Sequence, residues 1–170
     1  PGKDLVPDMI KAGDGYHVHV SGLTHDEHGR PVITPECQDA LVRRLVNKIR
    51  QNEPKIRMVE EDIPDDSDVI LVSYGISSRI VFLVRELARK EGIKAGIIRP
   101  IVVWPFPEEV FRKAAKKSRP FVVVEMNMGQ IVYEVERCAA GQAKTYLVPH
   151  AGGTVHNPED ILKIIREAVK

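Results

Sequence analysis

The chain has 170 residues, of which 43% are hydrophobic, and its 25 basic and 24 acidic residues leave a net charge of +1. This length and apolar content suit one domain, or one domain with a structured extension, that buries a core. No stretch is apolar enough for a membrane helix and the balanced charge creates no field for nucleic acid, so we expect a soluble cytoplasmic protein without either partner.

The first residues predict an extension rather than a core. Residues 1–14 mix proline, glycine and charge without periodicity, which indicates a connector or an arm lying on another surface. Tyr16–Ser21 alternates like a short strand, with His17 and His19 on one face. The chain starts at Pro1 without an initiator methionine, so we expect a fragment of a longer protein.

A polar loop from Gly22 to Pro31 concentrates ionisable groups more than any other segment. Four of its side chains are of metal-binding types: His25, Asp26, Glu27 and His28. Their spacing matches no strongly diagnostic site, so we expect no metal there. The simpler interpretation is a surface turn in which Thr24 and Asp26 bond to nearby backbone N–H groups.

A long helix is predicted after this loop, with Thr34 as N-cap and Pro35 at the first helical position. Its apolar residues recur every four positions: Cys37, Leu41, Leu45 and Ile49. Residues 51–66 predict a polar hinge with a short strand at 56–59 and an acidic turn. We therefore expect an N-terminal region over residues 1–66 and an α/β domain over residues 67–170.

The stretch Asp68–Gly92 predicts one strand, one turn and one helix. Val69–Val72 is continuously apolar and mostly β-branched, as a strand buried on both faces of a parallel sheet requires. Ser77 or Ser78 is the expected N-cap of an amphipathic helix that stops at Gly92. Such a pair is half of a parallel crossover unit.

The later chain repeats this unit. Further strands are predicted at residues 95–98, 121–125 and 145–148, and each is followed by a helical pattern. The last helix starts with Asn157 as N-cap and Pro158 at the first helical position. Four strand–helix pairs of similar size predict an α/β protein, a three-layer α/β/α fold with a mainly parallel sheet.

Ligands of open α/β sheets bind beyond the carboxyl ends of the strands, which directs attention to the turns there. Ser77, Ser78 and the next helix N-terminus could bind a small anion, although simple N-capping is the preferred interpretation. The glycines form no dinucleotide-binding or P-loop motif. A free-standing module that binds a small anion at these serines is therefore our alternative hypothesis.

The turn 126–130 is the more unusual one. Asn127, Gly129 and Gln130 lie at a strand-to-helix junction, where an amide and a glycine suit close contact with another chain or a cofactor. Helix capping by Asn127 remains open as an alternative. His150 lacks a placed carboxylate or nucleophile, so we assign it no catalytic role. The cysteines lack metal-binding spacing and are expected to be buried reduced thiols.

Several stretches together resemble the α subunit of 2-oxoacid:ferredoxin oxidoreductases, most closely the 2-oxoglutarate type. They are SGLTHDEHGRP, QDALVRRLVNKI, ILVSYGISSR, RPIVVWPFPEE and EMNMGQIVYEVER, and they cover nearly the whole chain in order. The resemblance implies a transketolase C-terminal-like domain. Similar enzymes convert a 2-oxoacid, coenzyme A (CoA) and oxidised ferredoxin to an acyl-CoA, carbon dioxide and reduced ferredoxin.

The resemblance also implies partners and cofactors held elsewhere. A β subunit is expected to carry thiamine diphosphate with Mg²⁺ and an iron–sulfur cluster, beside an N-terminal α domain. The family's N-terminal motif of the Tyr-Pro-Ile-Thr-Pro type is absent here, so no catalytic residue or metal site is assigned to this piece. By resemblance, Thr24, His25 or Asp26 borders the substrate channel, and Asn127, Gly129 and Gln130 are expected to serve subunit packing.

Overall fold

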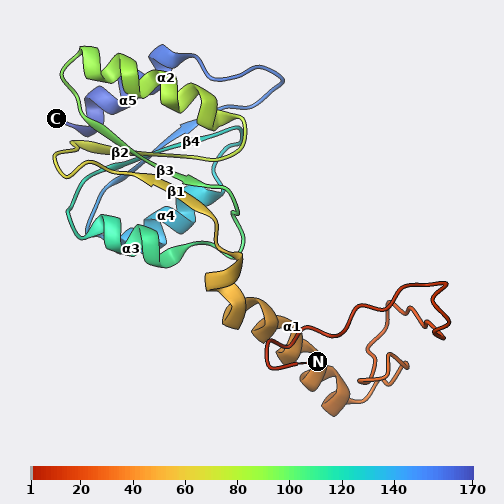
Figure 1. The fold of residues 1–170 in the computed structure, drawn as a ribbon. Helices are drawn as coiled ribbons and strands as arrows, with labels where there is room; N and C mark the ends of the chain where they lie inside the picture. The colour runs from red at the N-terminus through yellow and green to blue at the C-terminus, as the bar shows by residue number, and fades with distance from the viewer. Residues whose placement is uncertain (1) are drawn as a thin grey trace. The chain divides into compact units, whose positions relative to one another are not determined.

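The computed structural model describes residues 2–170, and this part of the chain divides into two compact units (Figure 1). The first runs up to Ile56 and the second from Arg57 to Lys170. The division falls earlier than the expected one at residue 66, because a strand inside the expected hinge belongs to the sheet of the second unit. All described residues that are buried lie in the second unit, which therefore contains the core.

The first unit is built around helix α1 (Pro35–Ile56). Its predicted start is confirmed, because the backbone N–H of Cys37 donates to Thr34 Oγ1 at 3.3 Å. The helix continues past the expected end near residue 50 and includes Pro54, which lacks the N–H that would otherwise donate to the Arg50 carbonyl oxygen. None of its residues is buried.

The strand expected at Tyr16–Ser21 is wrong. No described residue of this segment is in a strand, and Val20 is 88% exposed. An alternating pattern forms a strand only where a neighbour supplies backbone hydrogen bonds, and the pairing recorded nearby is an isolated bridge between His25 and Pro31.

Within residues 2–170 no helix is long and apolar enough to cross a bilayer.

The second unit is a five-stranded sheet with strand order β1-β3-β2-β4-β5. Four strands are parallel and β1 runs antiparallel to β3. The strands are β1 (Val59–Asp62), β2 (Val69–Ser73), β3 (Ala95–Pro100), β4 (Phe121–Glu125) and β5 (Thr145–Pro149). The helices are α2 (Ser77–Lys90), α3 (Glu108–Ala115), α4 (Ile131–Ala139) and α5 (Pro158–Ala168). The predicted α/β fold with a mainly parallel sheet is confirmed.

Helices cover both faces of the sheet, which explains the unbroken apolar strands (Figure 1). In β2, Val69 and Leu71 pack with α2 and α5, whereas Ile70 and Val72 pack with α3 and α4. All five residues of β2 and of β4 are buried. The three-layer arrangement therefore follows directly from the sequence runs that predicted it.

The edge strand β1 replaces the short strand predicted at residues 56–59: it begins only at Val59, because α1 extends to Ile56. It consists of Val59 and three acidic residues, a composition that disfavours a strand. Two basic residues of the second unit compensate it, because Arg99 donates to Glu60 at 2.9 Å and Arg85 donates to Asp62. The charged strand is tolerated at the sheet edge, where its acidic side chains remain exposed.

Charged residues join the helices on one face of the sheet. Arg137 of α4 donates to Glu108 at the start of α3 at 2.7 Å, and Arg112 donates to the same carboxylate at 3.0 Å. These bonds lower the pKa of Glu108 to about 2. The end of α4 is thereby tied to the start of α3.

Candidate functional site

The turns after β2, β4 and β5 bring the polar residues of the second unit to one edge of the sheet. Because these strands are parallel, their carboxyl ends lie at the same edge. This is the edge where the sequence predicted a site. The residue that organises it is Glu125, the last residue of β4, whose carboxylate the sequence analysis did not single out.

Glu125 is fully buried, and its carboxylate accepts hydrogen bonds from the backbone at the start of α4. The N–H groups of Gln130, Ile131 and Val132 donate to it at 3.2, 3.0 and 2.9 Å. These groups have no partner within the helix, and the helix dipole favours a negative charge at this end. The burial of a carboxylate is therefore compensated by bonds that its own chain supplies.

Two side chains complete the surroundings of this carboxylate. The amide of Asn127 donates to Glu125 Oε2 at 3.1 Å and to the Tyr74 hydroxyl oxygen at 3.0 Å. The Tyr74 hydroxyl donates to Glu125 Oε2 at 3.4 Å. Burial and the nearby Glu125 charge raise the pKa of Tyr74, so its hydroxyl stays protonated as a donor. The cluster serves to hold the turn in place.

Asn127 shapes the turn and does not cap α4, so the capping alternative is wrong. Its Oδ1 accepts from the Gly129 N–H at 2.7 Å, two residues on. Gly129 has a φ of +110°, and an added Cβ would lie 3.2 Å from both Leu147 Cδ2 and Val132 Cγ1. The position thus requires glycine for backbone conformation and for space. Gln130 takes part in this cluster through its backbone N–H, which donates to the Glu125 carboxylate.

Ser77 and Ser78 are not helix caps, contrary to the prediction. Ile76 precedes α2 and makes no side-chain cap bond, whereas both serines lie inside the first turn and are almost fully buried. The Ser73 hydroxyl donates to Ser78 Oγ at 3.3 Å. The helix starts at Ser77, directly after Ile76, so both serines lie in the packed first turn and not at the cap position. Their burial offers no support for the alternative of an anion site.

Thr24, His25 and Asp26 lie in the first unit. Asp26 Oδ1 accepts from the backbone N–H groups of His28 and Arg30, both at 2.9 Å, and the bond from Arg30 is the main cause that lowers the pKa of Asp26. The surface-turn interpretation is therefore confirmed for Asp26. The Thr24 hydroxyl instead donates to the Gln38 side chain, and His25 Nδ1 bonds to the Leu23 carbonyl oxygen at 3.1 Å.

No metal-binding group emerges from the described residues. Within residues 2–170, no three His, Cys, Asp or Glu side chains gather closely enough to hold an ion. A channel-bordering role for Thr24, His25 or Asp26 stays a prediction.

Two histidines that the sequence did not connect meet in the loop after β5. His156 is 4% exposed, and its Nε2–H donates to the Val148 carbonyl oxygen at 3.1 Å. Its Nδ1 is buried without a hydrogen-bond partner in the described structure. The centroids of the His150 and His156 rings lie 5.1 Å apart, and His150 Nε2 bonds to Thr154 Oγ1 at 3.0 Å. Burial lowers the pKa of His156.

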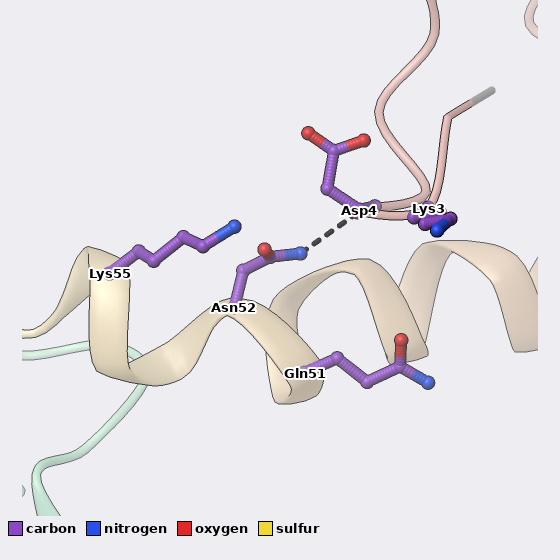
Figure 2. A pocket seen from close by; sticks show the side chains of 5 residues that line it. All are labelled: Lys3, Asp4, Gln51, Asn52 and Lys55. Carbon is purple, nitrogen blue, oxygen red and sulfur yellow. Dashed lines mark hydrogen bonds between the residues drawn. The ribbon is translucent and has the colours of Figure 1, made fainter.

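Two open pockets lie away from these residues. In the first unit, one open pocket is lined by five polar side chains of mixed charge, Lys3, Asp4, Gln51, Asn52 and Lys55 (Figure 2). Asn52 crosses it and donates to the Asp4 carbonyl oxygen at 2.8 Å. A second open pocket lies in the second unit, between β1 and α3. The predicted site residues line neither pocket.

Removing the buried carboxylate should destabilise the second unit. Glu125→Gln places an amide donor among backbone donors and is expected to lower the free energy of unfolding by about 2 kcal/mol. Glu125→Ala leaves several donors unpaired and should cost about 3 kcal/mol or more. Urea denaturation measures both, with the exposed Glu136→Gln on α4 as control. A Glu125→Ala protein as stable as the control would refute the role of Glu125 in pairing the N–H groups at the start of α4.

Gly129→Ala should destabilise more than the same change at a glycine with free space around it. Gly141 also has positive φ, +77°, but nothing lies within 4 Å of the position that an added Cβ would occupy. Gly141→Ala should therefore cost about 1 kcal/mol for backbone conformation alone. Gly129→Ala should cost about 1–3 kcal/mol more through overpacking. Thermal denaturation compares the two, and equal losses would count against the close approach of Leu147 and Val132.

Stability should fall in mild acid because of His156. The unfolded ring binds a proton near its ordinary pKa of about 6.5, whereas burial lowers the folded pKa. Below that pH the unfolded state takes up protons first, so stability declines as the pH falls towards the folded pKa. His156→Gln should flatten the dependence of unfolding free energy on pH below about 6.5, and the exposed His17→Gln is the control substitution. An unchanged slope in His156→Gln would contradict the assignment.

This architecture matches a known protein family. The family model described as pyruvate:ferredoxin oxidoreductase core domain II matches residues 67–161. The chain is 45% identical over 164 residues to the 2-oxoglutarate synthase subunit KorA of Methanothermobacter thermautotrophicus, a match that covers 96% of this chain and 44% of that subunit. The chain thus spans less than half the length of this curated relative.

Two solved structures share the fold. A 2-oxoglutarate:ferredoxin oxidoreductase from Magnetococcus marinus, with 2-oxoglutarate, coenzyme A and succinyl-CoA bound, aligns with a TM-score of 0.80 at 22% identity, over 99% of this chain and 30% of that one. A split-gene transketolase aligns with a TM-score of 0.55 at 16% identity, over 66% of this chain and 41% of that one. The transketolase-like fold expected from the resemblance is confirmed, and the chain belongs to the pyruvate:ferredoxin oxidoreductase core domain II family.

Proposed function

We propose that this chain is part of the α subunit of a 2-oxoacid:ferredoxin oxidoreductase and that its substrate is 2-oxoglutarate. The reaction would be oxidative decarboxylation to an acyl-CoA, with the electrons passed to ferredoxin. The observation that carries the proposal is the 45% identity over 96% of the chain to a 2-oxoglutarate synthase subunit. The matched residues include both units, so the N-terminal helix and loop belong to the similarity.

We assign this piece to subunit assembly and to positioning the catalytic parts, and not to the chemistry. Two ionisable groups at the carboxyl edge support this role, because Glu125 accepts bonds from backbone N–H groups and from Asn127, and Tyr74 stays protonated beside it. A general base needs a free basic atom within reach of its proton. Neither of these groups offers one.

The cofactors expected from the resemblance do not suit the donor set of this chain. An iron–sulfur cluster is commonly held by four cysteine thiolates, whereas the sequence has Cys37 and Cys138, which lie in different units. A bound Mg²⁺ with thiamine diphosphate needs carboxylate and carbonyl oxygens that converge, and the described residues hold no acidic cluster of that kind. We therefore propose that the β subunit and the N-terminal α domain hold these groups.

The full-length subunit that contains this chain, produced with its β subunit under anaerobic conditions, should reduce ferredoxin when 2-oxoglutarate and CoA are both added. Omitting either substrate should abolish reduction, which absorbance of the ferredoxin reports. Pyruvate and a branched 2-oxoacid are tested separately as alternative substrates.

The matched control is the 170-residue chain combined with the same β subunit, which should show no turnover because it corresponds to only 44% of the related subunit. Faster ferredoxin reduction with another 2-oxoacid would overturn the substrate assignment. Turnover by the short chain would overturn the positioning role.

A further inference from the structure

The loop between β5 and α5 carries a buried histidine directly after a run of exposed residues. Residues 151–155 are all exposed, and His156, which follows them, is 4% exposed. The loop, drawn in blue in Figure 1, projects from the carboxyl edge of the sheet. We propose that residues 150–156 form a pH-sensitive flap, which the neutral His156 ring holds closed and which opens when that ring takes up a proton. The flap is a property of this chain and does not depend on the enzyme to which the chain belongs.

Three hydrogen bonds hold the flap closed. The His150 N–H donates to the Glu125 carbonyl oxygen at 2.9 Å, and His150 Nε2 bonds to Thr154 Oγ1 at 3.0 Å. At the other end, His156 Nε2–H donates to the Val148 carbonyl oxygen at 3.1 Å. Within residues 150–156, all of which the structure describes, only His156 is buried. Its ring is therefore the anchor of the flap.

This anchor suits only the neutral form of the ring. One ring nitrogen of His156 donates to Val148, and the other, Nδ1, is buried without a hydrogen-bond partner in the described part of the chain. This is the arrangement of a neutral imidazole with its proton on Nε2. Protonation of Nδ1 would add a positive charge and a second donor inside the protein. A buried charge is costly unless it is paired, so the charged ring favours the exposed position of an open flap.

The groups that face the His156 ring from β4, β5 and α5 do not compensate that charge. The Val148 and Glu125 carbonyl oxygens and the Asp160 carboxylate favour the charged ring. The neighbouring His150 disfavours it, and burial is the largest influence, so the pKa of His156 lies below its ordinary value. The ring in the closed flap therefore stays neutral at a pH where an exposed histidine is already protonated.

Two glycines give the flap room to move. Gly152 has a φ of +111°, and nothing lies within 4 Å of the position that an added Cβ would occupy at Gly152 or at Gly153. Glycine changes its backbone conformation at little steric cost. Because residues 151–155 are already exposed, opening removes the His156 ring from the core and leaves the strands paired. It also breaks the bond from His150 to the last residue of β4, where the turn 126–130 begins.

Amide hydrogen exchange, followed by NMR on the 170-residue chain, tests the flap residue by residue. The His150 N–H reports opening, because its acceptor is the Glu125 carbonyl oxygen. The N–H of the buried Val123 in β4, which lies between β2 and β5, reports global unfolding. His156→Gln and His156→Phe remove the titrating ring and keep a neutral side chain, and the exposed His17→Gln is the matched control.

The protection factor of the His150 amide is its intrinsic exchange rate divided by the measured rate. It should fall about tenfold between about pH 7.5 and about pH 5.5, because the open flap carries a histidine with the ordinary pKa of about 6.5 and proton uptake raises its population by that factor. Both His156 variants should lose this dependence on pH, and His17→Gln should keep it.

Urea separates opening of the flap from global unfolding. Below the unfolding transition, exchange of the His150 amide should not depend on urea, because local opening exposes little surface, whereas exchange of the Val123 amide should accelerate. Equal responses of the two amides to urea, or a His150 protection factor that does not change with pH, would overturn the proposal. Both outcomes are measured on the unsubstituted chain, so they do not depend on how well a variant folds.

Discussion

A buried negative charge at the end of a central strand organises the functional edge of this protein. Glu125 satisfies backbone donors at the start of α4 and is itself bonded by Asn127 and Tyr74, so one carboxylate joins β4, α4 and the turn after β2. A buried charge is tolerated only when it is fully paired, and each partner is therefore constrained by the others. The fixed turn that results carries Met128 outward while Gly129 closes against Leu147.

This arrangement suits a domain whose role is to hold other parts. Glu125, Asn127 and Tyr74 bond to one another and to the backbone, whereas Met128 in the same turn is exposed and apolar. An active site would show the reverse, with polar groups free to meet a substrate and apolar walls around it. The membership of the pyruvate:ferredoxin oxidoreductase core domain II family agrees with a place inside a larger enzyme.

The sequence predicted the fold well and the site only in part. Runs such as Val69–Val72 and Phe121–Val124 indicate buried strands because they are short and mostly β-branched, and a strand buried on both faces has no polar positions. The acidic β1 could not be predicted in the same way, since Arg99 and Arg85 compensate it from distant positions in the chain. Glu125 was overlooked for a related reason: its partners follow it after a turn whose geometry only the folded chain reveals.

The acidic edge strand has a consequence for how the protein behaves at high concentration. An unpaired strand edge is a template on which other chains can add strands and grow into aggregates. In β1, Glu60, Glu61 and Asp62 place charged side chains along that edge, and an added strand would have to remove them and their arginine partners from water. The same residues that obscure β1 in the sequence therefore act as gatekeepers, protecting the sheet from growing beyond its own strands.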